Sequence, residues 1–239
     1  MNWKMNTAIL IGRDHELSAR NRQDFLLTHR TETRVCGIVC DGCGESSYSE
    51  LGAMLLSNFM LGRLKTIDIW DSPHSIKMIL ETAHYNFIEI LTSIMRVEKE
   101  NLPQFIQDYL LATLLFVVIE KDRTIVGQCG DGVIIRNRVP EIIDQDGKPS
   151  YMAYENVPRE MLKCEPSKLD YIKITEVQDC DSLVIASDGL TPIIGTDKET
   201  ELYGTTKRQL QRKFNVWQMR DKIFSDDVAC IVFEKDSPK

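Results

Sequence analysis

The sequence predicts an α+β fold in which antiparallel sheets are covered by helices. Short β-rich runs cluster with only turns between them, and helical periodicity occurs in separate blocks. Strands joined by turns favour antiparallel pairing over a regular βαβ alternation. At 239 residues the chain is long enough for one sizeable core and short for two typical domains, so we expect a single domain over residues 1–239.

The expected strands are runs rich in β-branched and aromatic residues, and the expected helices have apolar residues three and four apart. The strands are predicted at 7–11, 25–28, 35–40, 113–119, 124–129, 133–136, 171–174, 183–186 and 228–233. The helices are predicted at 49–64, 75–99, 103–110 and 206–220.

The stretch 137–170 is polar and interrupted by prolines, which is typical of an excursion from the core. Asp144 and Asp146 within it could belong to a calcium loop. The other ligands and the terminal glutamate of that motif are missing, so we interpret the pair as a tight turn.

Composition and charge exclude several classes of protein. A net charge of -7 argues against nonspecific nucleic-acid binding, which needs a clustered basic face. No apolar run approaches the roughly 20 residues that span a bilayer, and the N-terminus does not resemble a signal peptide. The seven cysteines are scattered and lie mostly in apolar runs, which indicates free thiols in a reducing compartment, so we expect a cytoplasmic protein. Cys36, Cys40 and Cys43 approach metal-ligand spacing, but no second CxxC or paired histidines complete a zinc site.

Three apolar runs adjoin aspartates: Asp41 and Asp188 follow predicted strands, and Asp226 precedes one. A single Asp-Gly after a strand is more often a turn than a ligand. Three carboxylates at strand ends are a plausible site for one or two hard divalent ions, which prefer oxygen ligands. Two further acidic motifs, Gln23-Asp24 and Gly130-Asp131-Gly132, adjoin other strands.

Taken in order, these motifs resemble those of the metal-dependent protein phosphatases of the 2C type, in their compact bacterial branch. The resemblance covers most of the chain. It is carried by Gln23-Asp24, Asp41-Gly-x-Gly44, Ser49-Glu-Leu-Gly-Ala53, Ala112-Thr113-Leu114, Cys129-Gly-Asp-Gly132, Ser187-Asp-Gly189 and Asp226-Asp227.

The resemblance implies a four-layer α/β/β/α sandwich of two antiparallel sheets flanked by helices. It also implies two Mn2+ or Mg2+ ions that activate a bridging hydroxide to hydrolyse phosphoserine and phosphothreonine. Asp41 would bridge both ions, with Asp188 and Asp226 on the first, the carbonyl of Gly42 on the second, and Asp24 on metal-bound waters. A phosphorylated protein would be the substrate, with a cognate serine/threonine kinase as a counterpart, and we expect a monomer that binds neither nucleic acid nor membrane.

The chain departs from the family at two positions. Ala19 stands where members often carry a phosphate-binding arginine, and either Arg20 or Arg22 could substitute, with Arg20 preferred. Many members bind a third metal through Asp131, Asp188 and an acid four residues later, but that last position is Pro192. The third site is therefore expected to be weak or absent. In relatives a flap that shapes substrate choice falls at about 137–170.

Other classes of phosphatase fit the sequence less well. A cysteine-dependent phosphatase needs Cys-x5-Arg, which no cysteine here satisfies, and the Asp179-x-Asp181 pair precedes its strand instead of following it. The four histidines form no ligand-spaced pair and are interpreted as structural, although His15 is close enough to the first acidic motif to reach a substrate. A catalytically silent regulatory member that binds metal or phosphoprotein, and a phosphatase of small molecules, remain alternatives.

Overall fold

The computed structural model describes residues 2–158, 160 and 171–236 of the chain. Its strands form two five-stranded sheets in which every pairing is antiparallel. The first sheet has the order β1 (Trp3–Leu10), β10 (Val228–Lys235), β9 (Ser182–Ala186), β6 (Gly132–Arg136) and β7 (Val139–Ile143). The second has the order β2 (Phe25–Arg30), β3 (Arg34–Cys40), β4 (Leu114–Glu120), β5 (Arg123–Cys129) and β8 (Lys173–Val177).

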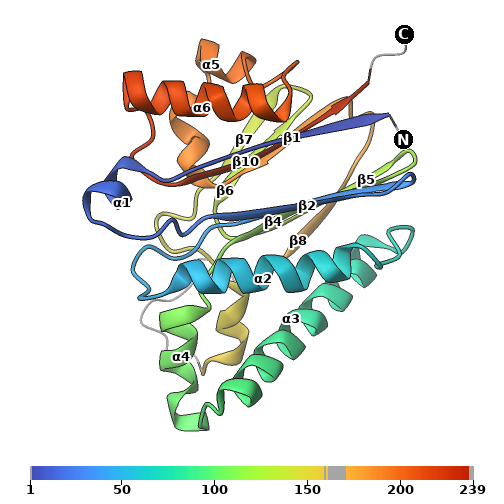
Figure 1. The fold of residues 1–239 in the computed structure, drawn as a ribbon. Coiled ribbons are helices and arrows are strands. Elements are labelled where there is room, and N and C mark those ends of the chain that lie inside the picture. The colour runs from blue at the N-terminus through green and yellow to red at the C-terminus, as the bar shows by residue number, and fades with distance from the viewer. Residues whose placement is uncertain (1, 159, 161–170, 237–239) are drawn as a thin grey trace.

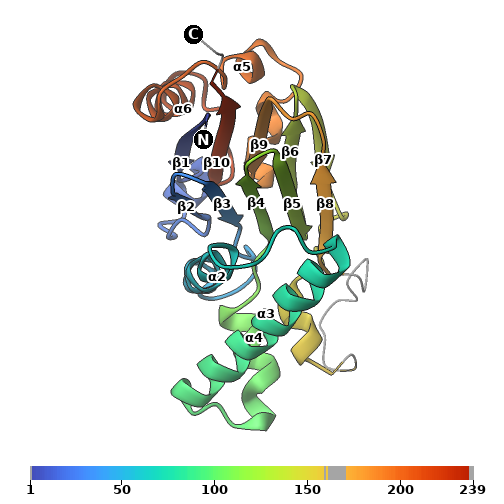
Figure 2. The same cartoon turned by 90° about the vertical axis from the view of Figure 1, so that its right-hand side faces the viewer.

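The two sheets stack face to face and helices cover both outer faces (Figure 1). The first sheet is covered by α5 (Asp197–Thr200) and α6 (Lys207–Asp221). The second is covered by α2 (Ser49–Leu64), α3 (Pro73–Met95) and α4 (Leu102–Tyr109), with α3 and α4 extending beyond the sheet (Figure 2). The predicted four-layer α/β/β/α sandwich is therefore confirmed.

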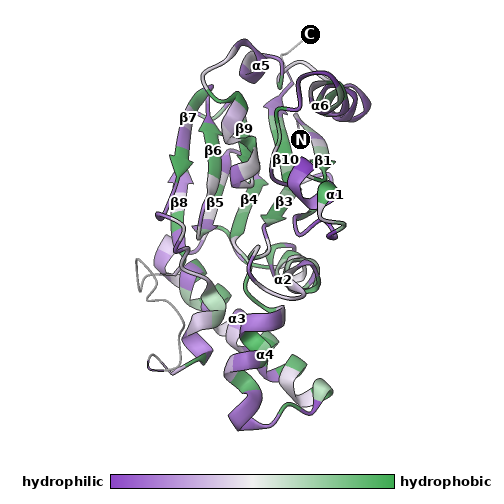
Figure 3. Cartoon of the chain, turned by 90° about the vertical axis from the view of Figure 1, so that its left-hand side faces the viewer, coloured by the Kyte–Doolittle hydropathy of each residue, from purple (hydrophilic) through white to green (hydrophobic). Residues whose placement is uncertain are grey.

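Strand β10 shows why the sandwich forms from this sequence. Successive side chains of a strand point to opposite faces. Ala229, Ile231 and Phe233 lie in the core between the sheets, whereas Cys230 and Val232 pack beneath α6. Because both faces are buried, the strand is a continuous apolar run, and the same run appears as a hydrophobic stripe in Figure 3.

Helix α6 covers the outer face of the first sheet, and its sequence is amphipathic. Leu210, Phe214 and Trp217 are buried at helical spacing, and the exposed face is polar (Figure 3). The helix begins at a capping box, in which Thr206 and Gln209 each satisfy the backbone N–H of the other.

The structure differs from the sequence prediction in part of 137–170. Residues Val139–Ile143 form the edge strand β7, where Pro140 pairs with Ile135 without disturbing a central ladder. The predicted turn at 144–147 is confirmed by the bond from the Asp146 amide to Asp144 Oδ1 at 2.8 Å. Residues 159 and 161–170 lie outside the described residues, and the interpretation of this stretch as a lid stays a prediction.

Three short helical segments were not predicted from the sequence: α1 (Arg13–Leu17), α5 and the 3-10 helix η4 (Asp188–Ile193). Another 3-10 helix, η2 (Met152–Asn156), falls within the same polar stretch as β7. Across the described part of the chain, no helix combines the length and apolar character needed to cross a membrane.

Candidate active site

The predicted acidic residues meet at one edge of the sandwich. A cleft of about 400 Å³ is lined by Asp41, Asp131, Asp188 and Asp226. An adjoining hollow of about 340 Å³ shares three of them, Asp131, Asp188 and Asp226. Side chains that are far apart in the sequence thus form one acidic wall.

Asp41 is held at the end of β3 by hydrogen bonds to the segment that leads into β4. Its amide donates to Thr113 Oγ1 at 3.1 Å, and the Thr113 amide donates to the Asp41 carbonyl at 2.8 Å. The Gly42 amide donates to the Gln23 carbonyl at 3.3 Å, and the Cys43 amide donates to the Leu111 carbonyl at 2.9 Å. The Asp41-Gly-x-Gly44 loop is therefore fixed on both sides, with Gly42 lining the cleft.

Two glycines allow other segments to pack against the backbone that carries Asp226. A Cβ at Gly189, next to Asp188, would lie 1.9 Å from the carbonyl oxygen of Asp227. A Cβ at Gly12, just before α1, would lie 2.2 Å from the carbonyl carbon of Asp226. Only glycine permits these approaches, and they bring the end of β9 and the start of α1 to the same loop.

Asp24 lies behind this wall and is buried, with 2% of its surface exposed. Its Oδ2 accepts a hydrogen bond from Ser187 Oγ at 2.5 Å, and its carboxyl interacts with that of Asp41. Asp24 does not line the cleft itself, and its connection to the cleft is its interaction with Asp41.

Burial and neighbouring negative charges raise the pKa values of the carboxyl groups in the cluster. Burial, followed by the charges of Asp24 and Asp188, raises the pKa of Asp41 well above its ordinary value. Burial is the main cause that raises the pKa of Asp24 to about 8, and burial and the neighbouring charge of Asp226 raise the pKa of Asp188. Ionised carboxylates this close repel unless a cation neutralises them. Oxygen donors crowded in this way fit a hard divalent ion.

Asp131 lies in the turn between β5 and β6, at the border of the two cavities. Burial and the charges of Asp144 and Asp188 raise its pKa to about 6, and its Oδ1 has no hydrogen-bond partner. Pro192 lines the second hollow where the family would offer a carboxylate. The weakening of a third metal site therefore stays a prediction.

The two candidate arginines point to different places. Arg20 Nη1 donates to the carbonyl of Gly44 at 2.9 Å. Gly44 lines the cleft, so the Arg20 guanidinium lies next to a residue of the cleft wall although Arg20 itself does not line the cleft. Arg22 Nε donates to the backbone carbonyl of Asp24 at 3.1 Å, and neither Arg22 nor Asp24 lines the cleft. This placement favours Arg20 as the phosphate ligand, a role that stays a prediction.

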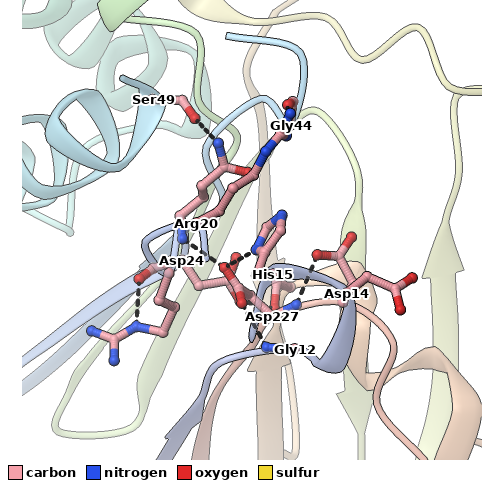
Figure 4. Close-up of polar contacts among 12 residues, drawn as sticks. Gly12, Asp14, His15, Arg20, Asp24, Gly44, Ser49 and Asp227 are labelled. Atoms are coloured by element: carbon pink, nitrogen blue, oxygen red, sulfur yellow. Dashed lines mark hydrogen bonds and ion pairs between the residues drawn. The ribbon is translucent and has the colours of Figure 1, made fainter. Parts of the chain in front are cut away.

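Asp227 is a residue whose importance the sequence did not show. It is 2% exposed and its two oxygens accept from the amides of Gly12, at 2.7 Å, and Gln23, at 2.6 Å. Its Oδ2 also lies 2.9 Å from His15 Nδ1 (Figure 4). His15, Asp226 and Asp227 come close enough to hold an ion. Through its two amide bonds, Asp227 ties the first acidic motif and the start of α1 to the start of β10.

Together the fold and the site define a class of protein: a two-sheet α/β/β/α sandwich with an acidic cleft at one edge of the sheets. The family model of protein phosphatase 2C matches residues 11–223, so the chain belongs to the protein phosphatase 2C family. This confirms the resemblance drawn from the motifs. Among curated proteins, none matches the sequence significantly.

Solved structures with the same fold span nearly the whole chain. The serine/threonine phosphatase Stp1 from Staphylococcus aureus is 15% identical, covers 99% of this chain and 96% of its own, and has a TM-score of 0.64. The catalytic domain of the serine threonine protein phosphatase PstP, in complex with two manganese ions, is 12% identical and has a TM-score of 0.61. The match covers 98% of this chain and 99% of the PstP chain. RsbX in complex with magnesium is 12% identical and has a TM-score of 0.58. The match covers 98% of this chain and 96% of the RsbX chain. At these identities the likeness establishes the fold.

Proposed function

We propose that this protein hydrolyses phosphoserine and phosphothreonine in proteins with the help of Mn2+ or Mg2+. The convergence of Asp41, Asp188 and Asp226 on one cleft, in a member of the protein phosphatase 2C family, carries the proposal. The manganese and magnesium bound to PstP and RsbX support these two ions as the cofactors.

Different residues of the chain would bind the metal ions, orient water and bind the phosphate. Asp41, Asp188, Asp226 and the Gly42 carbonyl would hold two ions, and Asp24 would orient water from behind Asp41. Arg20 would bind the phosphate at the rim. When bound, the ions would lower the pKa of water and neutralise the phosphoryl oxygens. The attack is expected to need no covalent intermediate.

The first experiment measures hydrolysis by the purified protein. With added manganese, we expect turnover of p-nitrophenyl phosphate and of a phosphothreonine peptide, and loss of both with EDTA. A protein that binds divalent ions but is inert toward both substrates would be the regulatory member of the family. Hydrolysis of small phosphate esters without any turnover of phosphopeptides would instead assign a small-molecule substrate.

Asp41→Asn tests the site. The substitution keeps the shape of the side chain but removes the charge from the central carboxylate, so turnover should fall by at least about 10²-fold. Asp122→Asn is the matched control, because Asp122 is exposed in the turn between β4 and β5 and lies away from the cleft. Unchanged turnover in Asp41→Asn would refute the site assignment.

A further inference from the structure

Helix α1 holds a histidine against the acidic cleft. Its first two amides donate to the carbonyls of Phe224 and Ser225, at 3.2 and 3.0 Å, in the loop just before Asp226. The close approach of Gly12 to that loop fixes the start of the helix. His15 therefore lines the same cleft as Asp226, although the two residues are more than 200 positions apart.

The imidazole of His15 has one nitrogen on a buried carboxylate. Its Nδ1 lies 2.9 Å from Asp227 Oδ2, and the side chains of His15 and Asp227 are 13% and 2% exposed. In Figure 4 the other ring nitrogen points away from Asp227. Because Nδ1 faces the Asp227 carboxylate, Nε2 is the ring nitrogen that remains available to a substrate.

The contacts of Asp227 and Arg20 indicate that His15 has a role beyond packing. Two amides hold Asp227 in place, one on each carboxylate oxygen, so its position does not depend on His15 alone. The Arg20 amide also donates to the His15 carbonyl at 2.9 Å, which couples His15 to the arginine at the rim of the cleft. A phosphate ester bound between Arg20 and the acidic wall would thus have His15 beside it.

We propose that His15 is a catalytic residue that donates a proton from Nε2 to the leaving oxygen of the phosphate ester, with Asp227 as its positioning residue. This inference rests on the proposed function. A water oxygen forms the new bond to phosphorus, and the bond between phosphorus and the leaving oxygen breaks. The leaving oxygen keeps that electron pair and takes the Nε2 proton to become the serine or threonine hydroxyl. The attacking water gives one proton to solvent, and the neutral imidazole takes one up, so the charges balance.

The chemistry of the leaving group provides the test. A serine or threonine alkoxide is a poor leaving group and needs a proton, whereas p-nitrophenolate spreads its charge over the ring and leaves without one. In His15→Gln, kcat for a phosphothreonine peptide should fall by about 10²-fold or more. The loss for p-nitrophenyl phosphate should be smaller by at least about tenfold. His74→Gln, an exposed histidine at the start of α3, is the matched control and should change neither rate.

Two further measurements separate this role from a structural or metal-binding one. Free imidazole should restore part of the peptide turnover of His15→Ala, because a small base can occupy the space that the side chain leaves. Manganese affinity, measured by calorimetry, should stay within about twofold of wild type in His15→Gln, since Asp227 and not an ion holds the ring. A tenfold loss of affinity would assign His15 to the metal and overturn the proposal.

Equal losses for the two substrates in His15→Gln, without rescue by imidazole, would also overturn it. Asp227→Asn should also lose more turnover of the phosphothreonine peptide than of p-nitrophenyl phosphate. The losses should be smaller than those of His15→Gln, because Asn keeps one acceptor oxygen. Wild-type protein that hydrolyses neither substrate would refute the proposed function itself. Active wild-type protein with no difference between substrates in His15→Gln would refute only the inference about His15.

Discussion

Ser187 Oγ donates a hydrogen bond to Asp24 Oδ2 at 2.5 Å, and this bond joins the end of β9 in one sheet to the residue before β2 in the other. Ser187 is fully buried, and its hydroxyl also accepts from the Ala229 amide at 3.0 Å. One side chain thus connects both sheets directly behind the acidic cleft.

Ser187→Ala should destabilise the protein by about 1–3 kcal/mol. The substitution removes a donor from Asp24 and leaves the buried Ala229 amide without its acceptor. The free energy of unfolding, measured in urea, checks the prediction. Ser93→Ala is the control, because Ser93 is exposed on α3 and should lie within about 0.5 kcal/mol of wild type. Equal stability of the two variants would show that the bond between the sheets contributes nothing.

Gly189→Ala should lower both stability and activity, because its Cβ would lie 1.9 Å from the Asp227 carbonyl oxygen. We expect a loss of about 1–3 kcal/mol, the usual range for overpacking, together with a displaced Asp226. Gly62→Ala is the matched control: Gly62 lies in α2 with nothing within 4 Å of an added Cβ. That control should gain about 0.5–1 kcal/mol, because alanine favours the helix. Thermal unfolding and peptide turnover of both variants test this contrast.

The regular elements could be predicted because their buried faces appear in the sequence as apolar patterns. Both faces of β10 are apolar, and α2 was predicted with the bounds that the structure shows, 49–64. Strand β7 was missed, since an edge strand tolerates a proline and polar residues that would break a central one. Helix α1 was missed because its five residues have no buried face and are held by the 224–227 loop, a contact between distant segments.

Part of the candidate site could also be predicted from the sequence. Asp41, Asp188 and Asp226 could be found because each adjoins an apolar strand. The burial of Asp24 behind Asp41 could not be found, since it depends on how the two sheets stack. The pairing of His15 with Asp227 has no local signal either, because only the close packing at Gly12 brings them together.

Metal-free protein should lose stability as the pH rises. Folding raises the pKa of Asp24 to about 8 and also raises the pKa values of Asp41 and Asp188. The folded state therefore binds more protons than the unfolded state, and this contribution is present below about pH 4 and lost as the pH rises toward about 8.

Thermal unfolding in EDTA should accordingly give a lower Tm at pH 8 than the same protein with manganese, and the difference should shrink at pH 5. Asp41→Asn should be more stable than wild type in EDTA at pH 8, because one repelling charge is gone. It should gain less from manganese. A manganese effect of the same size at both pH values would contradict this account of the cluster.

Substitution of Arg20 and of Arg22 should have different effects on KM. Arg20 reaches the Gly44 carbonyl at the rim of the cleft, so Arg20→Ala should raise KM for a phosphothreonine peptide by about tenfold, as expected for the loss of a charged phosphate contact. Arg22 bonds the backbone carbonyl of Asp24, so Arg22→Ala should change KM by less than about twofold and instead lower stability by about 1 kcal/mol.

Steady-state kinetics and urea unfolding of both variants provide the comparison, and each arginine serves as the control for the other. Arg20→Lys should recover only part of the affinity, because lysine keeps the charge but cannot form two parallel hydrogen bonds to phosphate. A larger KM effect in Arg22→Ala than in Arg20→Ala would reverse the assignment. It would mean that the guanidinium of Arg22 leaves the Asp24 carbonyl when substrate binds.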